Sequence, residues 1–323
     1  MRTLAARSEH WPLTRPFRIS RGEKTAADVV VAELRDGDLV GQGECVPYAR
    51  YGETIESVLA QIASADPALS REGLQAALPD GAARNAVDCA MWDLEAKRQG
   101  RSIATMLGRD EPGAMATAVT VVIDTPERMA AEAALVAQAP LIKVKVNASD
   151  PVTMVRAVRE AAPSARLIVD PNEGWTPALL LHVLPELAKL DIALIEQPIP
   201  AAEDAALEGL SPPIPICADE SAHTRANLAE IARRYQAVNI KLDKTGGLTE
   251  ALAMEAAART AGLKIMIGCM VCTSLAILPA LLLAQNADFV DLDGPWWLKQ
   301  DRADAIHIEN GVLTPPLTGW GKP

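Results

Sequence analysis

The sequence contains three acidic residues at regular intervals, each at the end of a short apolar run. Asp170 follows the run LIV, Glu196 follows ALI, and Asp219 follows ICA. Three carboxylates brought close together repel one another, and a divalent cation removes that repulsion. All three donors are hard oxygens, and no cluster of histidines and cysteines accompanies them. The pattern therefore predicts that these residues bind Mg²⁺, with Mn²⁺ as the alternative.

Two lysines flank these acids along the chain. Lys145 ends the run LIKVK, and Lys241 ends the run VNIK. One lysine could remove the weakly acidic α-proton of a substrate carboxylate, and the other could return a proton to the opposite face. The enolate formed in between needs a cation at the carboxylate oxygens, and Mg²⁺ supplies it. A base also needs a lowered pKa, which Mg²⁺ and the neighbouring Lys143 favour. Lys143 and Lys145 alone would be read as a solvated strand end, but with Lys241 and the acids we favour catalysis.

The same pattern, a short apolar run that ends in a polar residue, recurs along most of the chain and predicts the elements that position these residues. Eight short apolar runs follow one another at steps of 22 to 27 residues, with helical patterns between them. Their closing residues are Thr120, Lys145, Asp170, Glu196, Asp219, Lys241, Gly268 and Asp291. Eight buried strands joined by seven helices are typical of an α/β fold, a (β/α)7β barrel of the TIM type. An open, doubly wound sheet is disfavoured because no Gly-x-Gly-x-x-Gly motif follows any of these runs.

In such a barrel the active site lies at the C-terminal ends of the strands. Lys145 and Lys241 end the second and sixth strands, which are four apart in a ring of eight. We therefore expect these lysines to face each other across the mouth of the barrel. The acids of strands three to five would hold the metal to one side, between them.

The residues before the repeat have a different pattern, typical of a small α+β domain. Residues 27–34 and 39–45 flank an Asp-Gly-Asp turn and predict a hairpin, and residues 81–98 show helical apolar spacing. The pattern breaks at Glu111-Pro112-Gly113. We predict a capping domain at 1–112, the barrel at 113–305, and a C-terminal tail at 306–323 that packs back on the cap.

Four basic residues stand three apart near the start of this otherwise acidic chain: Arg15, Arg18, Arg21 and Lys24. They precede the first long strand expected in the cap. One interpretation is a solvated basic loop. The other is a loop that closes over the barrel mouth and presents an arginine to a substrate carboxylate. We name Arg21 for this role, with Arg18 next.

Composition excludes several classes of function. Lys+Arg 31 against Asp+Glu 42 gives a net charge of −11, which argues against nucleic acid or an anionic membrane as partner. No apolar run reaches the roughly 18 residues of a membrane span, and the first residues lack a secretion signal. The five scattered cysteines fit reduced thiols in the cytoplasm. Cys269 and Cys272 have no second pair, so we do not favour a metal or redox role there. The oligomeric state stays open, with a homo-oligomer among the alternatives.

Taken together, the motifs resemble the muconate-lactonizing subgroup of the enolase superfamily, and most closely its dipeptide epimerases. The matching motifs are KVK (143–145), DPN (170–172), EQP (196–198), ADES (218–221), KLD (241–243) and DLD (291–293). The last of them is the Asp-x-Asp motif that marks the dipeptide epimerases. Pro171 stands where that family is expected to have a small residue, and this departure leaves the catalytic positions untouched.

The resemblance implies an isomerase that converts L-Ala-D-Glu to L-Ala-L-Glu in murein peptide metabolism, with peptidoglycan recycling as its setting. The reaction would be a Mg²⁺-dependent, two-base 1,1-proton transfer at the glutamyl α-carbon, with Lys145 serving the D-Glu face and Lys241 the L-Glu face. Asp291 and Asp293 would hold the free ammonium of the dipeptide. The other implied substrate contacts are Thr120, Lys143, Cys269 and Val271. A flexible loop from the region of Arg21 caps the site in this family.

Two alternative functions stay open. A cycloisomerase or o-succinylbenzoate synthase of the same subgroup shares the lysines and the acids. Its substrates carry no ammonium, however, so Asp291 and Asp293 would be two anions facing an anionic substrate, with no cation to bind. A non-catalytic, Mg²⁺-dependent small-molecule binding protein on the same scaffold would not need two opposed lysines.

Overall fold

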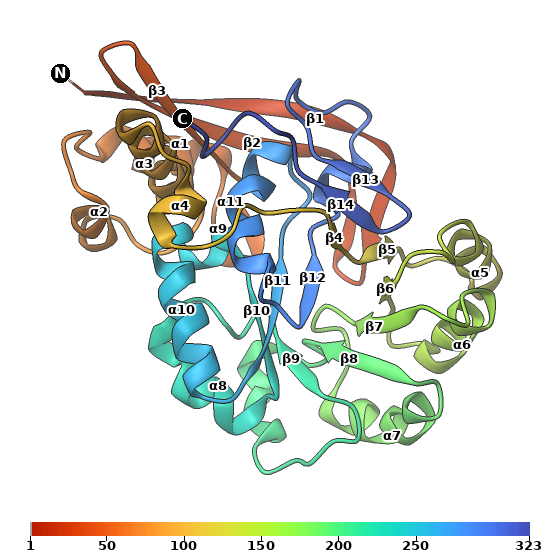
Figure 1. Ribbon diagram of the computed structural model, residues 1–323. Helices are drawn as coiled ribbons and strands as arrows, with labels where there is room; N and C mark the ends of the chain where they lie inside the picture. Colours follow the sequence, from red (N-terminus) through yellow and green to blue (C-terminus); the bar gives the residue numbers. More distant parts are fainter. Residues whose placement is uncertain (1) are drawn as a thin grey trace.

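The computed structural model describes residues 2–323, and its N-terminal part is an antiparallel sheet covered by helices. The strands are ordered β1 (Thr3–Ile19), β2 (Gly22–Asp36) and β3 (Leu39–Cys45). The helices are α1 (Ile55–Ser64), α2 (Arg71–Ala77), α3 (Ala82–Gln99) and α4 (Ile103–Leu107). This part, which we call the cap, lies above the strands of the second sheet in Figure 1.

The longest of these helices, α3, packs directly on β3 because two glycines allow a close approach. A Cβ atom at Gly41 would lie 2.6 Å from Leu94 N, and one at Gly43 would lie 2.8 Å from Ala90 N. Neither separation is tolerated by real side chains, so the backbone contact depends on glycine. The contact seals a core between the sheet and the helices of the cap, which includes Val30, Leu34, Leu74, Val87 and Leu94.

Within residues 2–323, eight parallel strands form the second sheet, in sequential order from β5 to β12. The strands are β5 (Val119–Val121), β6 (Leu141–Lys145), β7 (Arg166–Asp170), β8 (Ile192–Glu196), β9 (Ile216–Ala218), β10 (Ala237–Ile240), β11 (Lys264–Gly268) and β12 (Phe289–Asp291). The two edges of the sheet meet where Ala118 N donates to Val290 O at 2.8 Å. This arrangement confirms the predicted α/β barrel with a cap.

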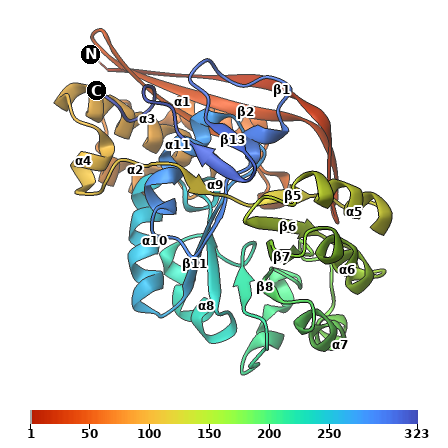
Figure 2. The same ribbon diagram turned by 45° about the vertical axis from the view of Figure 1, so that its right-hand side comes forward.

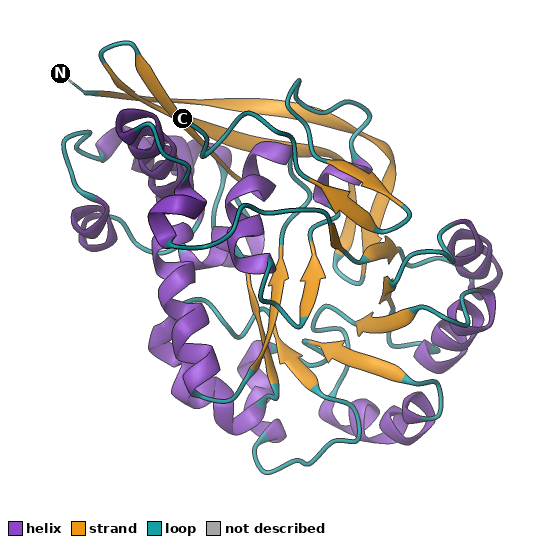
Figure 3. Cartoon of the chain, viewed as in Figure 1, coloured by secondary structure: helices purple, strands orange, loops and turns teal. Residues whose placement is uncertain are grey.

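Helices surround the barrel strands, as Figure 3 shows by its colours. They are α5 (Pro126–Leu135), α6 (Pro151–Ala161), α7 (Pro177–Ala188), α8 (Leu228–Arg234), α9 (Leu242–Thr245), α10 (Leu248–Thr260) and α11 (Ser274–Ala284). One expected helix is different, because β8 and β9 are joined by the 3₁₀ segment η2 (Ala201–Leu207). Pro198 and Pro200 precede η2 and Pro212, Pro213 and Pro215 follow it, so the connection has little room for an α-helix.

Side chains alternate along each strand, so that every second residue points into the barrel interior. Each strand segment gives one inward apolar residue to a buried layer: Ala118, Leu141, Ile168, Leu194, Cys217, Ala237, Met266 and Phe289. Because side chains two apart point to the same face, Lys143, Asp170 and Glu196 also point inward, above that layer. The apolar layer closes the barrel below, and the polar layer lies at its C-terminal mouth.

The basic residues near the N-terminus lie on a long hairpin rather than on a loop. Arg15 and Arg18 belong to β1, Lys24 belongs to β2, and Arg21 sits in the turn between them. The two strands pair from Thr3 to Ile19, with a register shift between Pro12 and Phe17. In Figure 2 the hairpin runs from the cap toward β5 of the barrel.

The C-terminal segment returns to the cap. Strands β13 (His307–Glu309) and β14 (Val312–Thr314) pair with the short β4 (Met115–Ala116). Beyond them, Trp320 Nε1 donates to Cys89 O at 3.1 Å, and Gly321 N donates to Asp93 Oδ1 at 2.9 Å. This segment therefore lies against α3. Among the described helices, none has the length and apolarity needed to cross a membrane.

Candidate active site

The predicted lysines and acids meet in one buried cluster at the barrel mouth. Lys145 Nζ lies 2.5 Å from Asp170 Oδ2, and Lys241 Nζ lies 2.7 Å from Asp219 Oδ2. Lys145 is at the end of β6 and Lys241 directly follows β10, with three strands between them in the sheet. Both side chains line the same cavity of about 570 Å³. The structure thus places the two lysines in one cavity, each on a different acid.

Lys143 occupies the centre of the cluster and contacts three carboxylates. Its ammonium lies 3.0 Å from Asp170 Oδ2, 2.6 Å from Glu196 Oε2 and 2.7 Å from Asp291 Oδ2. Glu196 itself is fully buried, and its other oxygen accepts a hydrogen bond from Asn239 Nδ2 at 2.8 Å. Lys143, on β6, therefore balances negative charge contributed by β7, β8 and β12.

Burial and neighbouring charges shift the pKa values of these groups in opposite directions. Burial, followed by the charge of Asp170, raises the pKa of Glu196 to about 8. Burial also raises the pKa of Asp219, but Lys241 and Lys244 outweigh it, so that pKa lies well below its usual value. For Lys241, burial lowers the pKa, yet Asp219 and Glu196 outweigh it and raise it well above the ordinary value. The acids thus hold Lys241 as an ammonium here.

The acidic residues fit a hard divalent cation by their chemistry and position. Among residues 2–323, no three of His, Cys, Asp and Glu are close enough to hold a metal as they stand, because lysine ammonium groups lie between the carboxylates. Glu196 Oε2 is buried and lacks hydrogen-bonding geometry toward Lys143, despite the short distance. Three buried carboxylates on adjacent strands supply the oxygen donors that Mg²⁺ prefers. Withdrawal of the lysine ammonium groups would free Asp170, Glu196 and Asp219 to bind it.

Two aspartates face the lysine cluster, Asp291 at the end of β12 and Asp293 two residues beyond it. Asp291 contacts Lys143, and its Oδ1 atom is buried without a hydrogen-bond partner in the described chain. Asp293 Oδ2 accepts hydrogen bonds from Thr120 N at 2.8 Å and Trp297 Nε1 at 3.4 Å. Burial, followed by the charge of Asp291, raises the pKa of Asp293 to about 6. The pair is an anionic pocket with spare acceptor capacity, suited to a small cation.

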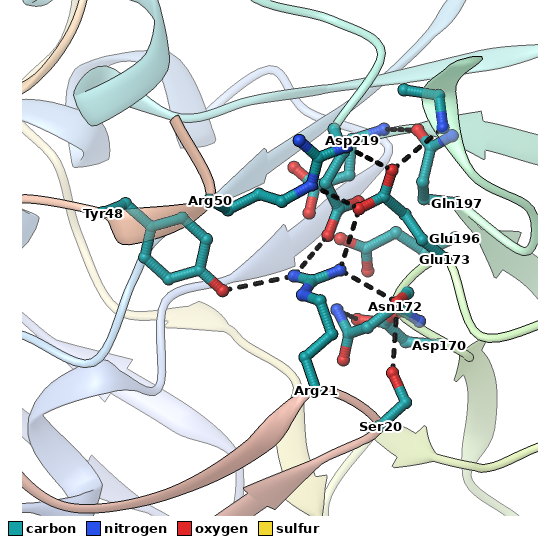
Figure 4. Close-up of polar contacts among 12 residues, drawn as sticks. Ser20, Arg21, Tyr48, Arg50, Asp170, Asn172, Glu173, Glu196, Gln197 and Asp219 are labelled. Carbon is teal, nitrogen blue, oxygen red and sulfur yellow. Dashed lines mark hydrogen bonds and ion pairs between the residues drawn. The ribbon is translucent and has the colours of Figure 1, made fainter. Parts of the chain in front are cut away.

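Arg21 connects the hairpin of the cap to the loops after β7 and β9. Its guanidinium lies 2.7 Å from Glu220 Oε1 and donates to Asn172 O at 2.8 Å and to the Tyr48 hydroxyl at 3.2 Å. Arg50 of the cap makes a two-pronged contact with Glu173, which also contacts Arg21, as Figure 4 shows. Burial lowers the pKa of Arg21, but Glu220 outweighs it and raises the pKa above its ordinary value. The structure thus places Arg21 in a clamp between cap and barrel.

The remaining predicted contacts line the same cavity. Thr120, Cys269 and Val271 form its wall, together with Asp291 and Asp293. Arg15 contacts Glu132 and Arg18 contacts Glu23 and Asp124, so neither lies in the cavity wall. Lys24 does line the cavity, 5.0 Å above the ring of Tyr48, and has no ion-pair partner within residues 2–323. From the sequence we named Arg21 as the residue that binds a substrate carboxylate, and we did not name Lys24 for this role.

The cap anchors the segment that carries Lys241. Asp243 Oδ1, in the short helix α9, accepts hydrogen bonds from Val46 N at 3.0 Å and Asn85 Nδ2 at 2.9 Å. Arg84 of α3 donates to Thr245 O at 2.8 Å. Burial raises the pKa of Asp243 to about 7. These contacts fix the backbone just after Lys241, and no local sequence pattern predicts them.

Two further polar residues in the cluster were missed from the sequence. Asn239 is completely buried and bonds Glu196, and Lys244 is completely buried and lies 2.6 Å from Asp219 Oδ1. Alternation along the run VNIK places Asn239 on the face of Lys241 and was an available signal. Lys244 follows the strand in a helical turn, so alternation gave no sign of it.

Comparison with known families accounts for most of the chain. Residues 128–322 match the family Enolase C-terminal domain-like. Residues 1–108 match the family Mandelate racemase / muconate lactonizing enzyme, N-terminal domain. The two matches together cover both the barrel and the cap.

Individual proteins show the same similarity. The chain is 51% identical over 319 residues to L-Ala-D/L-Glu epimerase of Escherichia coli (strain K12), covering 97% of this chain and 99% of that protein. A solved enolase family member from Agrobacterium tumefaciens, with homology to dipeptide epimerases and with bound sodium and L-Ala-L-Glu, is 49% identical, covers 98% of both chains and has a TM-score of 0.95. Dipeptide epimerase from Methylococcus capsulatus, complexed with Mg and the dipeptide L-Arg-D-Lys, is 33% identical, covers 97% of both chains and has a TM-score of 0.88.

Proposed function

Because this chain belongs to the mandelate racemase and muconate lactonizing enzyme family of the enolase superfamily, we propose that it is a Mg²⁺-dependent dipeptide epimerase. Its reaction is the interconversion of L-Ala-D-Glu and L-Ala-L-Glu by proton transfer at the glutamyl α-carbon. The observation that carries the proposal is the placement of Lys145 and Lys241 in one cavity, four strands apart. Asp291, at the end of β12, and Asp293, just after it, line the same cavity.

Each lysine serves one face of the substrate. Lys145 takes or returns the α-proton on the D-Glu side, and Lys241 does so on the L-Glu side. Epimerisation then follows when one lysine removes the proton and the other delivers one to the opposite face. Both lysines are almost completely buried and line the cavity, so their ammonium groups point at the space where the substrate would lie.

The carboxylates of Asp170, Glu196 and Asp219 would hold the metal. A Mg²⁺ ion held there would offset the charge of the acids that otherwise raise the pKa of Lys241, and it would supply positive charge near the substrate carboxylate. The strand ends keep these oxygens fixed relative to both lysines.

The cap and β12 select the two ends of the dipeptide. Asp293 and Asp291 bind the free ammonium of the first residue through charge-assisted hydrogen bonds. The side-chain carboxylate of the second residue lies toward the hairpin, where Arg21 was predicted to bind it. Because Arg21 is already engaged by Glu220 and Asn172, Lys24 is the second candidate for this contact.

The proposed setting is the recycling of cell-wall peptides in the cytoplasm. It is supported by the dipeptide itself and by the five free cysteines among the described residues. A homo-oligomer remains the alternative to a monomer. The acidic net charge of −11 supports a small-molecule substrate rather than nucleic acid or an anionic membrane.

The test is isotope exchange. The protein is incubated with Mg²⁺ and L-Ala-D-Glu in D2O, and the glutamyl α-proton is followed by NMR together with the appearance of L-Ala-L-Glu. We expect both deuterium uptake and epimerisation, and loss of both after exhaustive chelation. Tight binding of the dipeptide without exchange would support the non-catalytic binding protein instead. Exchange only with substrates that lack an ammonium would support a cycloisomerase or a synthase.

A further inference from the structure

Two cysteines lie close together just after β11, one in the cavity wall and the other buried behind it. Cys269 is partly exposed and lines the cavity, whereas Cys272 is almost completely buried, at 1% exposure. Both thiols are free. The other three cysteines, Cys45, Cys89 and Cys217, are buried and none of them lines the main cavity. Only this pair therefore combines an accessible thiol with a neighbouring one, within the described chain.

The two sulfur atoms pack against the same point of the backbone, at Gly294. A Cβ atom at Gly294 would lie 3.0 Å from Cys272 Sγ and 3.2 Å from Cys269 Sγ. A side chain at position 294 would also lie 2.6 Å from Met270 O, so glycine leaves the room that both sulfurs occupy next to Asp293.

The two thiols differ in their exposure to the cavity, and this difference indicates which of them meets an oxidant first. Burial raises the pKa of Cys272 well above its ordinary value, so this thiol stays protonated and shielded from solvent. Cys269 opens to the cavity, where a small oxidant can reach it. An accessible cysteine next to a buried partner is the arrangement in which a first oxidation product is resolved as a disulfide.

We propose that Cys269 and Cys272 are a reversible oxidation site that reacts with hydroperoxides. The Cys269 thiolate attacks the peroxide, an S–O bond forms, the O–O bond breaks, and an alcohol or water leaves. The sulfur of Cys272 then attacks Cys269, an S–S bond forms, the S–O bond breaks, and water leaves with the proton of the Cys272 thiol. In sum, two thiols lose two electrons and two protons, and the peroxide takes them up.

The disulfide alters the substrate cavity. Bond formation brings the sulfur atoms to about 2.05 Å and draws Cys269 away from the cavity wall toward Cys272. The shared neighbour of both sulfurs is Gly294, which directly follows Asp293, so the change reaches the proposed ammonium site. Oxidation therefore weakens dipeptide turnover, and a thiol reductant restores it. This last effect depends on the proposed function, whereas the oxidation itself does not.

The test treats the intact, folded protein with hydrogen peroxide and maps its peptides by mass spectrometry, with and without dithiothreitol. We expect a reducible link between Cys269 and Cys272 and no change at Cys217. In Cys272→Ser we expect a sulfenic acid at Cys269 that dimedone traps, and in Cys269→Ser we expect no oxidation of Cys272. Wild-type protein that carries an unlinked sulfenic or sulfinic acid at Cys269 would overturn the proposal, as would a link to any other cysteine.

Epimerase activity is measured on the same samples. A fall on oxidation that dithiothreitol reverses supports the effect on the cavity, and unchanged activity in fully linked protein refutes it. Absence of activity in the reduced protein would count against the proposed function, while the peptide map would still decide the oxidation site.

Discussion

Replacement of Asp293 by asparagine tests whether Asp291 and Asp293, at the end of β12 and just after it, bind the ammonium of a dipeptide. The substitution keeps the shape of the side chain and removes its charge. Thr120 N donates to Asp293 Oδ2, so in the variant the asparagine oxygen would keep this hydrogen bond and its NH₂ group would point toward the cavity. A hydrogen-bond donor would then face the substrate ammonium, itself a donor, where an acceptor stood before.

The size of the effect follows from the lost contact. A hydrogen bond between charged groups contributes about 1.5–3 kcal/mol, which corresponds to about a 10- to 150-fold fall in kcat/KM for L-Ala-D-Glu. N-acetyl-L-Ala-D-Glu lacks the ammonium and should lose much less. Because the pKa of Asp293 is about 6, wild-type kcat/KM for the dipeptide should also fall as the pH drops through 6 and the carboxylate becomes protonated. Asp293→Asn should lack that acidic limb.

The assay compares kcat/KM on both substrates for wild type, Asp293→Asn and the control Asp288→Asn. Asp288 is exposed just before the opposite end of the same strand, and its replacement should leave the ratio of the two substrates unchanged. Equal losses on the free and the acetylated dipeptide in Asp293→Asn would refute the assignment of the ammonium site. They would also favour the cycloisomerase or synthase alternative.

Further perturbations address the metal, the two bases and the cap. Asp170→Asn, Glu196→Gln and Asp219→Asn should each weaken Mg²⁺ binding, measured by calorimetry, and nearly abolish turnover, because each removes an anionic ligand; unchanged Mg²⁺ affinity would contradict the ligand set. Lys241→Ala should lose epimerisation but still exchange the α-proton of L-Ala-D-Glu in D2O, and Lys145→Ala should exchange only L-Ala-L-Glu; near wild-type epimerisation by either would rule out two bases. The fold raises the pKa of Asp243 to about 7, so this side chain takes up a proton on folding between about pH 4 and 7, and its burial as an anion lowers the stability of the fold above that range. The melting temperature of Asp243→Asn should therefore exceed that of wild type by more at pH 8 than at pH 4.5. An equal difference at both pH values would contradict the raised pKa.

The barrel could be predicted from the sequence because its physical signals are local and periodic. Strands such as LIKVK and ALIE are buried on both faces, so they read as apolar runs that end in polar residues. Closure of eight such strands then requires Lys145, Asp170 and Glu196 to share one mouth. The fold follows from this pattern, whereas the family and the proposed reaction follow from the resemblance carried by the motifs at the strand ends; all three agree with the comparisons. The roles of the individual site residues and the domain bounds 1–112, 113–305 and 306–323 stay predictions.

Other features depend on contacts between distant residues, which no local pattern records. The segment from Arg15 to Lys24 was predicted as a loop, yet most of it lies in β1 and β2, whose pairing stabilises both strands. The clamp of Arg21 requires Glu220 and Asn172, which lie about 150 to 200 residues away. The short 3₁₀ connection after β8 was missed because only its spacing, and not its prolines, was weighed.

The way the cap is closed has a consequence for biosynthesis. Thr14 bonds Trp297, Arg302 bonds Glu9 and Glu44, and Trp320 bonds Cys89, over separations of 231 to 293 residues. A nascent cap leaving the ribosome lacks all of these partners until the rest of the barrel has been translated. Its sheet edge and apolar surface then remain uncovered for most of elongation, and loop closure over such lengths is slow. The cap has a core of its own, but we expect it to reach its final packing only after the last part of the chain has been translated.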